Sequence, residues 1–365
     1  MTGVGTSRIA RLAERLSAEG VDAFVGWSAV TMGYLHEFHE GGGERFMALC
    51  VRSNGDSRLI CPALSATQAA RAGIESVVPW RDGEDPLQHF RRLTEDWSLR
   101  AAIIAVDPEL PAHMLLAMQS AAPAALFKPG GELISALTRV KEPAELALLR
   151  QAARIADDAF PKALQELRPG ITESELEQAL TEEMRRLGGK PAFCIVATGA
   201  NGAEPHHLSD DTRIVEGDVA VVDFGCTVGG YYSDITRTVC VGKASEEARR
   251  VYAIVHDAQA RARDAIRPGI ECQEIDRIAR KVIADAGYGA YFMHRLGHGI
   301  GMRGHEDPCL VEGNAHRLEP GNCFSVEPGI YLPGKFGVRI ENIVSVAASG
   351  HESLNEEPPA ELLEI

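Results

Sequence analysis

An internal repeat in the second half of the 365-residue chain constrains the fold more than any other feature. The segment Arg168-Pro169-Gly170-Ile171 recurs 99 residues later as Arg267-Pro268-Gly269-Ile270. Six further pairs match in the same register: Ile155 with Ile254, Asp158 with Asp257, Ala159 with Ala258, Glu175 with Glu274, Gly188 with Gly287, and Phe193 with Phe292. Each copy reads as a helix, a turn, a second helix and then strands. We therefore predict two similar α+β halves related by a pseudo-two-fold axis, with residues of both halves lining any site between them.

The first part of the chain has a different character. Strand patterns at 21–27, 45–51, 57–62 and 101–107 alternate with helical patterns at 64–72, 86–97 and 111–122. Such alternation is typical of an α/β layer domain. A long helical stretch over 142–167 then begins the repeat-containing part, with Pro143 suited to its first turn. We predict two domains, residues 1–137 and 138–365.

Each half of the repeat carries one hairpin with two acidic residues. Two β-rich runs flank Val228-Gly229-Gly230, with Asp223 and Asp234 5.5 positions on either side of the turn centre. In the second hairpin, centred on Gly334, Glu327 and Glu341 each lie seven positions away. Both acid pairs are thus predicted to lie opposite each other across their ladders. Opposed like charges are destabilising unless a cation lies between them.

The segment HRLGHGIGMRGHEDP, which contains His294, His298 and His305, lies between the hairpins. Imidazole together with carboxylates suits manganese, cobalt, iron or zinc better than calcium or magnesium. Four carboxylates and these histidines therefore predict a two-metal site that polarises a carbonyl and activates water.

Charge and motif absences exclude several classes of protein. With 37 Lys and Arg against 52 Asp and Glu, the net charge is −15, which disfavours nucleic acid and anionic membranes as partners. No run approaches the roughly 20 apolar residues of a membrane span, and the amino-terminal residues do not form a signal peptide. The eight cysteines are scattered, and no G-x-S-x-G, H-E-x-x-H or P-loop motif occurs. We expect a cytoplasmic protein.

Five motifs in order, VVDFG, YYSDITRT, HRLGHGIG, SVEPGIY and GVRIEN, resemble those of the M24 metallopeptidases, specifically prolidase and aminopeptidase P. The resemblance spans residues 140–365 and is weaker before them. It implies a creatinase-like α/β amino-terminal domain followed by an α+β pita-bread catalytic domain. It also implies a homodimer, and hydrolysis of Xaa-Pro bonds at a free amino terminus by a hydroxide bridging two divalent ions. Manganese is expected first, then cobalt, zinc or iron; the choice between dipeptides and longer peptides is open.

The resemblance assigns roles to ten residues of this chain. Five are implied metal ligands: Asp223, Asp234, His298, Glu327 and Glu341. Asp234 and Glu341 would bridge the two ions. Glu327 would also carry a proton to the leaving nitrogen, and His206 and His305 would bind the scissile carbonyl. Three more lie around the site: His294, Arg339 and Thr236. Thr236 would support the bridging solvent, while Arg339 is equally compatible with an ion pair and with a substrate contact.

Two details depart from the family pattern. Gly304 stands before His305 where relatives carry a β-branched residue, and His206 is followed by His207, so either histidine could enter the site. Two other functions remain as alternatives. One is a hydrolase or lyase of the same fold that acts on a small non-peptide molecule. The other is a non-catalytic binding paralogue, in which loss of ligands would be expected.

Overall fold

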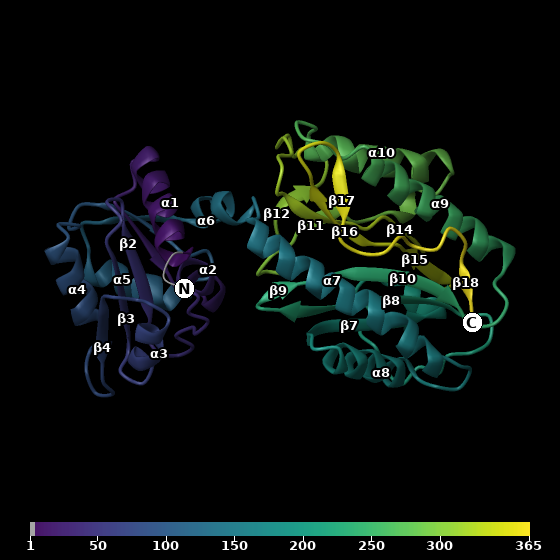
Figure 1. Ribbon diagram of the computed structural model, residues 1–365, viewed down its shortest axis with the longest axis horizontal. Coiled ribbons are helices and arrows are strands. Elements are labelled where there is room, and N and C mark those ends of the chain that lie inside the picture. The colour runs from purple at the N-terminus through teal and green to yellow at the C-terminus, as the bar shows by residue number, and fades with distance from the viewer. Residues whose placement is uncertain (1–3) are drawn as a thin grey trace. The chain divides into compact units, whose positions relative to one another are not determined.

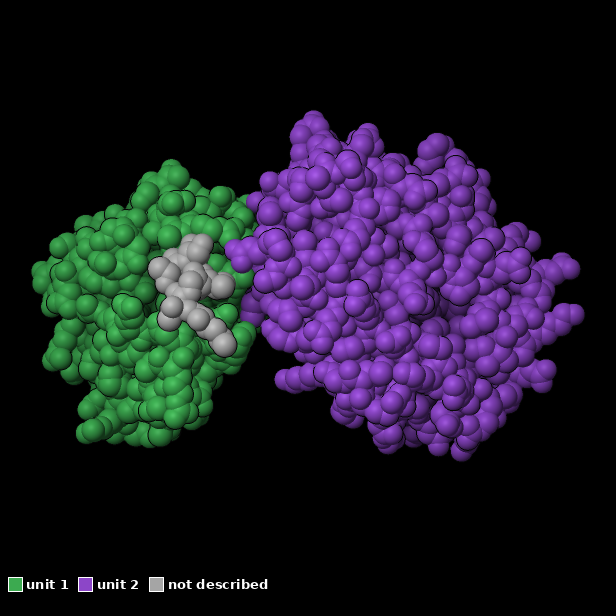
Figure 2. Space-filling view, viewed as in Figure 1, with its two compact units in different colours: residues 1–138 green, residues 139–365 purple. Residues whose placement is uncertain are grey.

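The computed structural model describes residues 4–365, with side chains from Arg8 onward, and divides into two compact units (Figure 2). Unit 1 is Met1–Thr138 and unit 2 is Arg139–Ile365. The predicted domain boundary after residue 137 lies one residue before this division. Among the described residues, no helix has the length and apolar character to cross a bilayer.

Unit 1 is a six-stranded mixed sheet with helices, and its strand order is β4-β3-β2-β1-β5-β6. The strands are β1 Ala23–Gly26, β2 Ala48–Arg52, β3 Ser57–Pro62, β4 Val77–Trp80, β5 Ile103–Val106 and β6 Leu126–Pro129. The helices are α1 Val4–Ala18, α2 Ala29–His36, α3 Ala66–Arg71, α4 Leu87–Asp96, α5 Ala112–Ala121 and α6 Gly131–Thr138. The α/β prediction is correct. It missed β4 and β6, which have four residues each, and α6, which has eight. It also missed α2, whose almost wholly apolar sequence shows no helical period.

The helices of unit 2 follow the repeat closely. They are α7 Pro143–Ala163, α8 Glu173–Arg186, α9 Glu246–Asp264 and α10 Cys272–Asp285, with three short 3₁₀ turns, η1 Leu164–Glu166, η2 Gly199–Ala203 and η3 Gly289–Tyr291. Both ends of α8 and α10 are 99 residues apart. In Figure 1, α8 lies below the sheets of this unit and α9 and α10 lie above them. The buried faces of α8 and α10 also correspond: Leu176, Leu180 and Met184 in one, Ile275, Ala279 and Ile283 in the other.

The repeated Arg-Pro-Gly-Ile turns are held in the same way in both halves. Gly170 has a φ of +99° and Gly269 a φ of +86°, in the left-handed region that glycine adopts without strain. The guanidinium of Arg213 donates to the carbonyl of Gly170 at 2.6 Å, and that of Arg317 donates to the carbonyl of Gly269 at 2.8 Å. The repeat in the sequence is therefore a repeat in the structure.

Two five-stranded sheets and one two-stranded sheet carry the rest of unit 2. The first contains β18-β10-β8-β7 with β9 paired to β8, the second β12-β11-β13-β16-β17, and the third β14-β15. Their bounds are β7 Lys190–Thr198, β8 Val219–Val228, β9 Tyr231–Tyr232, β10 Ile235–Cys240, β11 Gly297–Gly299, β12 Glu306–Leu310, β13 Cys323–Val326, β14 Gly329–Leu332, β15 Phe336–Arg339, β16 Asn342–Val346, β17 His351–Ser353 and β18 Leu363–Glu364.

The first acidic hairpin differs from the prediction in its register. Asp223 on β8 pairs with Thr236 on β10, so Asp223 and Asp234 are not directly opposite each other. The turn residues are Gly229 and Gly230, with φ of +56° and +86°, between the paired Val228 and Tyr231. A two-residue turn with positive φ at both positions is best made by two glycines, which shifts the turn centre by one residue. The two aspartates are therefore diagonal neighbours.

The second hairpin has the predicted register. Ile330 pairs with Val338 in β14–β15, and Val326 pairs with Asn342 in β13–β16. Both pairings have the same register. Glu327 and Glu341 therefore occupy opposed positions between the β13–β16 pair and the β14–β15 pair. This prediction is confirmed, because the chain turns at Gly334, whose φ is +72°.

Candidate active site

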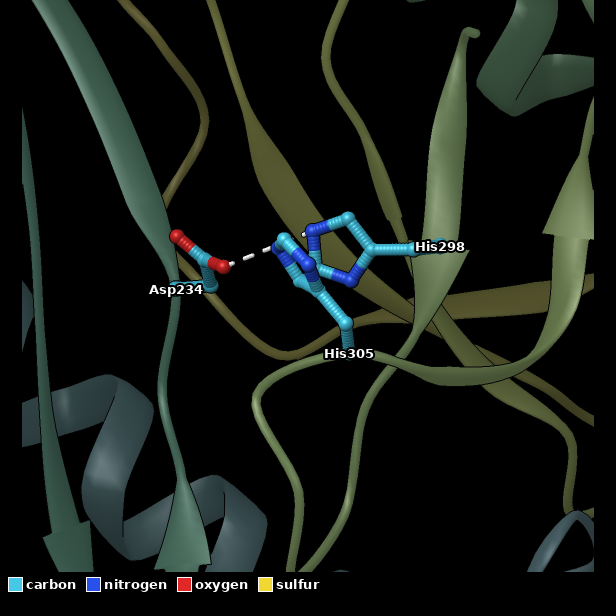
Figure 3. A group of neighbouring side chains, drawn as sticks. All are labelled: Asp234, His298 and His305. Atoms are coloured by element: carbon cyan, nitrogen blue, oxygen red, sulfur yellow. Dashed lines mark ion pairs between the residues drawn. The ribbon is translucent and has the colours of Figure 1, made fainter. Parts of the chain in front are cut away.

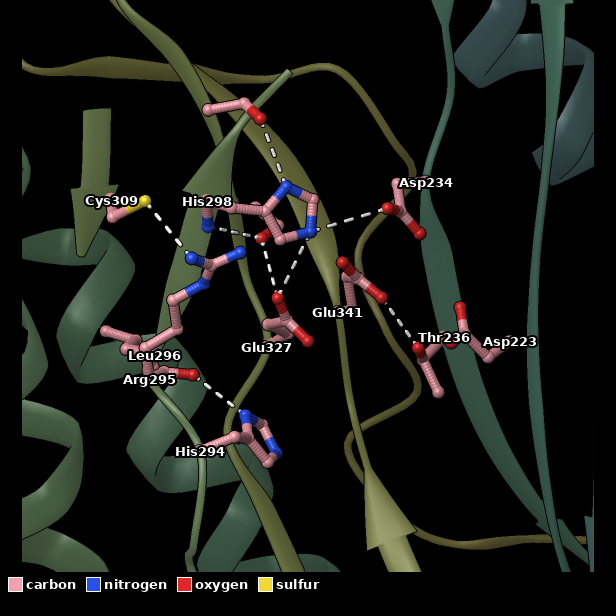
Figure 4. A network of polar contacts seen from close by, with 12 residues as sticks. Asp223, Asp234, Thr236, His294, Arg295, Leu296, His298, Cys309, Glu327 and Glu341 are labelled. Atoms are coloured by element: carbon pink, nitrogen blue, oxygen red, sulfur yellow. Dashed lines mark hydrogen bonds and ion pairs between the residues drawn. The ribbon is translucent and has the colours of Figure 1, made fainter. Parts of the chain in front are cut away.

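Carboxylates from both hairpins meet in one place, as Figure 4 shows. Asp223 lies on β8, Asp234 comes directly before β10, and Glu341 lies between β15 and β16. One oxygen of each lies within 4.8 Å of the others. The diagonal position of Asp223 and Asp234 still brings their carboxylates together, because both side chains point to the same face of the sheet.

A second group shares Glu341 with the first. It contains His298 of β11 and Glu327, which follows β13, and one ligand atom of each again lies within 4.8 Å of the others. His298 Nε2 is 3.3 Å from Glu327 Oε1 and 3.6 Å from Asp234 Oδ2. The five residues that the sequence selected are thus gathered into two overlapping groups of three with Glu341 in both.

His305 lies beside these groups. With Asp234 and His298 it forms a further group of side chains within 4.8 Å, drawn in Figure 3. The ring centroids of His298 and His305 are 3.8 Å apart. A Cβ on Gly304 would meet the ring of Tyr232 at 3.6 Å, an ordinary contact, so glycine is not required by the space at this position.

The buried carboxylates have strongly raised pKa values. Burial raises the pKa of Asp234 and of Glu341 well above the usual carboxyl range, and the neighbouring carboxylates raise both further. Burial also raises the pKa of Glu327 to about 7. Like charges removed from water disfavour their ionised forms. The chain by itself therefore holds four clustered acids, against which Arg339, paired with Asp223, supplies one positive charge.

Burial favours the neutral form of three histidines of the site. Burial lowers the pKa of His298 to about 3 and that of His294 to about 4, and it lowers the pKa of His305 as well. The Nδ1 of His298 lies 3.0 Å from the carbonyl oxygen of Gly299, so Nδ1 carries the proton and Nε2 presents its lone pair to Asp234 and Glu327. A neutral imidazole oriented through its other nitrogen is the form that binds metals.

The donor set fits divalent cations. Among the described side chains, Asp223 Oδ1 and Glu341 Oε1 are buried with no hydrogen-bond partner, although buried carboxylate oxygens normally have one. Both residues belong to the first group of three. Cations bound there would satisfy these oxygens and would offset the repulsion that raises the carboxyl pKa values.

Thr236 and Arg339 orient the carboxylates. The Thr236 hydroxyl donates to Glu341 Oε2 at 2.6 Å and accepts from Arg339 Nε at 3.1 Å. Arg339 also donates to Asp223 Oδ2 at 2.7 Å and to the hydroxyl of Tyr331 at 2.9 Å. Arg339 is 4 % exposed. The sequence left two roles open for Arg339, and the structure shows the ion pair, with Asp223. The Thr236 hydroxyl has Glu341 as its partner.

Loss of the Thr236 hydroxyl is expected to weaken metal binding. Thr236→Val keeps the shape of the side chain but leaves Glu341 Oε2 and Arg339 Nε without their partner. Removing a group that orients a metal ligand typically costs 10–100-fold in metal affinity, and we expect that loss here. Titration of the chelated protein with metal measures it, and Thr227→Val, on the same β8–β10 sheet, is the control. Equal affinities in the three proteins would contradict this role.

His294 is fixed from α10. Asp276, fully buried, accepts from the backbone N–H of Leu296 at 3.0 Å and from Arg280 at 2.9 Å. Arg280 in turn donates to the carbonyl oxygens of Phe292 and His294, at 3.0 and 2.9 Å. His294 Nε2 lies 2.9 Å from the hydroxyl of Tyr331, which links it to Arg339. His294 thus belongs to the polar network around the carboxylates.

The structure separates His206 from His207. His207 Nε2 lies 2.8 Å from Glu173 Oε2, away from the carboxylate groups. His206 is exposed and directly follows Pro205, whose carbonyl oxygen accepts from Arg339 Nη1 at 3.5 Å, so the backbone before His206 contacts the polar network of the site. His207 is therefore bonded to a fully buried carboxylate and is not a solvated loop residue.

Several residues of the site escaped the sequence reasoning. Tyr331 bonds to both His294 and Arg339, and Arg295 donates to the thiol of Cys309 at 3.3 Å beside His298. A buried ion pair between Lys141 and Glu306 adjoins His305. The motifs HRLGHGIG and SVEPGIY contain Arg295 and Tyr331, so their place in those motifs was the available signal. Lys141 has no comparable motif.

Comparison with known proteins places this architecture in one family. Residues 147–348 match the model of metallopeptidase family M24, and residues 8–140 match the creatinase/prolidase N-terminal domain. The chain belongs to the M24 metallopeptidase family, with a creatinase-type amino-terminal domain and the pita-bread catalytic fold. The predicted family and fold class are confirmed.

Individual relatives resemble the chain over nearly its whole length. The Xaa-Pro dipeptidase of Lactobacillus delbrueckii subsp. lactis is 36% identical over 344 residues, which are 91% of this chain and 92% of the relative. The structure of dipeptidase PepE from Mycobacterium ulcerans has a TM-score of 0.94 at 36% identity and covers 100% of this chain and 98% of its own. The X-Pro aminopeptidase of Thermotoga maritima has a TM-score of 0.87 at 32% identity, covering 98% and 99%.

Proposed function

We propose that this protein is an Xaa-Pro dipeptidase that uses two divalent metal ions. The observation that carries the proposal is the convergence of five ligand-type side chains from both hairpins, with Asp223 Oδ1 and Glu341 Oε1 buried and unpartnered, in an M24 chain. The Xaa-Pro specificity is supported by relatives at 36% identity that bear this name. The same name favours dipeptides over longer peptides.

The proposed ligands are the five residues chosen from the sequence: Asp223, Asp234, His298, Glu327 and Glu341. Asp234, His298 and Glu341 each belong to two of the three-residue groups. Of these three, only the carboxylates have two oxygens that could bind two ions, which supports a bridging role for Asp234 and Glu341. Divalent cations held there would polarise the scissile carbonyl and lower the pKa of a water molecule. One imidazole among four carboxylates is an oxygen-rich set, which favours manganese over zinc, cobalt and iron.

In this proposal Glu327 transfers the proton. A water oxygen adds to the carbonyl carbon and one of its protons passes to Glu327. That proton then passes to the proline nitrogen as the C–N bond breaks. A carboxylate at this position suits the task because it can accept a proton from water and return it to the leaving nitrogen. Ser325 Oγ lies 2.9 Å from Glu327 Oε1 and helps to orient the carboxylate.

His206 and His305 are the proposed hydrogen-bond donors to the carbonyl and to the oxyanion that develops from it. The free amine of the substrate would lie near Asp223, which favours cleavage at the amino terminus. A homodimer and a cytoplasmic location remain predictions from the family resemblance, and light scattering of the purified protein tests the first.

A panel of peptides tests the proposal. We expect the manganese-loaded protein to cleave an Xaa-Pro dipeptide at least about 100-fold faster than the matching Xaa-Ala dipeptide or the N-acetylated Xaa-Pro. It should also cleave the dipeptide faster than the corresponding Xaa-Pro-Xaa tripeptide. Metal analysis of the purified protein identifies the native ion. Failure to cleave any Xaa-Pro peptide with two ions verified per chain would contradict the proposal in favour of a non-peptide substrate or a binding paralogue.

A further inference from the structure

Glu173 is a fully buried carboxylate that the proposed reaction does not use. It is the first residue of α8 and is 0 % exposed. Five donors converge on its two oxygens: the backbone N–H and the hydroxyl of Thr198 at 2.8 and 3.0 Å, Asn201 Nδ2 at 3.1 Å, His207 Nε2 at 2.8 Å, and the backbone N–H of Asp210 at 3.3 Å. Burial of a carboxylate is tolerated only where donors satisfy it in this way.

The donors come from both ends of one segment, residues 199–212, which we call the histidine loop because it carries His206. Thr198 ends β7 directly before the loop, and Asp210 lies near the end of the loop. The backbone N–H of Glu173 also donates to the carbonyl oxygen of Thr212 at 3.1 Å. One residue of α8 therefore closes the loop at its start and at its finish.

The histidine loop in turn touches the candidate active site. Arg339 Nη1 donates to the carbonyl oxygen of Pro205 at 3.5 Å, directly before His206. The loop also packs closely on β15, because a Cβ on Gly337 would lie 1.8 Å from the carbonyl oxygen of Gly202. Any displacement of the loop from α8 would therefore move His206 relative to Arg339 and the carboxylates.

We propose that Glu173, with His207 as its side-chain partner, is a positioning residue that holds the histidine loop so that His206 can donate to the substrate carbonyl. The inference rests on the proposed role of His206. Glu173 itself lies outside the carboxylate groups and acts only through the loop. A carboxylate can only accept hydrogen bonds, so His207 Nε2 carries a proton and is the donor.

A metal site is the competing interpretation of this cluster. Ligand-type atoms of Glu173, His207 and Asp210 do lie within 4.8 Å of one another. Both oxygens of Glu173, however, already accept from N–H and O–H groups, and His207 Nε2 donates its proton to one of them. Protons occupy the lone pairs that a cation would need. The hydrogen bonds alone account for the cluster.

Glu173→Gln tests the proposal by a double-mutant cycle. The amide keeps the size of the side chain but loses one acceptor and turns an N–H₂ group toward donors. We expect kcat on an Xaa-Pro dipeptide to fall about 10–100-fold with metal content unchanged, as for small misplacements of a catalytic group. Added to His206→Ala, the change should cost little more, because the two act as one unit. Losses that multiply would overturn the proposal.

Glu175→Gln is the matched control. Glu175 lies in the same turn of α8 and caps that helix through Thr172, but it is exposed and makes no bond to the histidine loop. This variant should keep the kcat of the parent protein. At position 207, His207→Gln retains an N–H donor and should recover most of the kcat that His207→Leu loses. Equal losses in the two variants would contradict the assignment of His207.

Hydrogen exchange tests the anchoring without a substrate. Backbone amides of residues 199–212 should exchange at least about tenfold faster in Glu173→Gln than in the parent, while those of β8 stay unchanged. If the parent protein cleaves no Xaa-Pro peptide, the proposed function fails and this measurement still decides whether Glu173 holds the loop. Unchanged exchange in the loop would overturn the inference.

Discussion

Replacing Glu327 by glutamine is expected to lower kcat for an Xaa-Pro dipeptide by about 10³-fold or more. The amide keeps the volume of the carboxylate and one oxygen, but it cannot accept a proton from water or deliver one to the leaving nitrogen. General acid–base catalysis contributes about 10²–10⁴-fold by itself. Glu327 also lies 3.3 Å from His298 Nε2 within the candidate metal groups, so a weaker metal site would add to the loss.

Metal analysis separates these two contributions. Kinetics are measured at saturating metal, with the stoichiometry determined on the same sample. Glu247→Gln is the control, because Glu247 forms an ion pair with Lys335 at the surface and this variant should keep full activity. The assignment of Glu327 would be wrong if Glu327→Gln retained two ions and turned over at the rate of the parent.

The parts of this site that the sequence revealed are those that local spacing encodes. Glu327 and Glu341 could be paired because the turn at Gly334 sets the register of residues on either side. His298 and His305 stand out because an imidazole in a glycine-rich segment has few structural uses. The repeat likewise fixed both ends of α8 and α10 in relation to each other.

The first hairpin shows how little separates a correct register from a wrong one. The sequence has glycine at both 229 and 230. A two-residue turn with positive φ at both positions therefore fits these two residues. Centring the turn one residue earlier paired Asp223 with Asp234, whereas its partner is Thr236. Because of that error, the sequence did not reveal that Thr236 lies opposite Asp223 and bonds to Glu341.

Contacts between distant segments could not be read from the sequence. Glu173 and His207 are 34 residues apart, and Asp276 and Leu296 are 20 apart. Each pair depends on how a helix packs on its sheet. Both buried acids lie on the second helix of their half and bond the chain segment that carries an active-site histidine. They are not equivalent positions of the repeat, because the residue 99 positions after Glu173 is Cys272. The two halves therefore support their histidines through similar but separate contacts.

Asp234→Asn is expected to abolish activity and yet to stabilise the metal-free protein. Asp234 is 6 % exposed, and burial with neighbouring carboxylates raises its pKa well above the usual range. Asparagine removes this charge at constant volume. We expect kcat/KM to fall at least about 10³-fold through loss of a metal ligand. The chelated variant should melt several degrees above the chelated parent at pH 7.5, about 2–4 °C for each kcal/mol gained.

The pH relative to the raised carboxyl pKa determines how much Asp234→Asn raises Tm. A carboxyl whose pKa is higher in the folded state than in the unfolded chain stabilises the fold at low pH, and that stability is lost as pH rises through the folded pKa. For Asp234 the loss begins as pH rises above the ordinary carboxyl value of 3.8, and it continues because the pKa of this group in the folded state lies well above that value. The difference in Tm between Asp234→Asn and the parent should therefore be small at pH 4.5 and grow toward pH 7.5. His298, whose pKa burial lowers to about 3, acts in the opposite direction in both proteins and so largely cancels in the difference.

Metal should reverse the order of the two proteins. Ions that bind only the folded state add stability in proportion to the logarithm of their concentration over Kd, and the parent binds them more tightly. Asp285→Asn, at an exposed site paired with Lys281, should leave Tm nearly unchanged in both conditions. If chelated Asp234→Asn melted below the parent at pH 7.5, the carboxylates would not repel one another, and the case for cations at this site would lose its electrostatic basis.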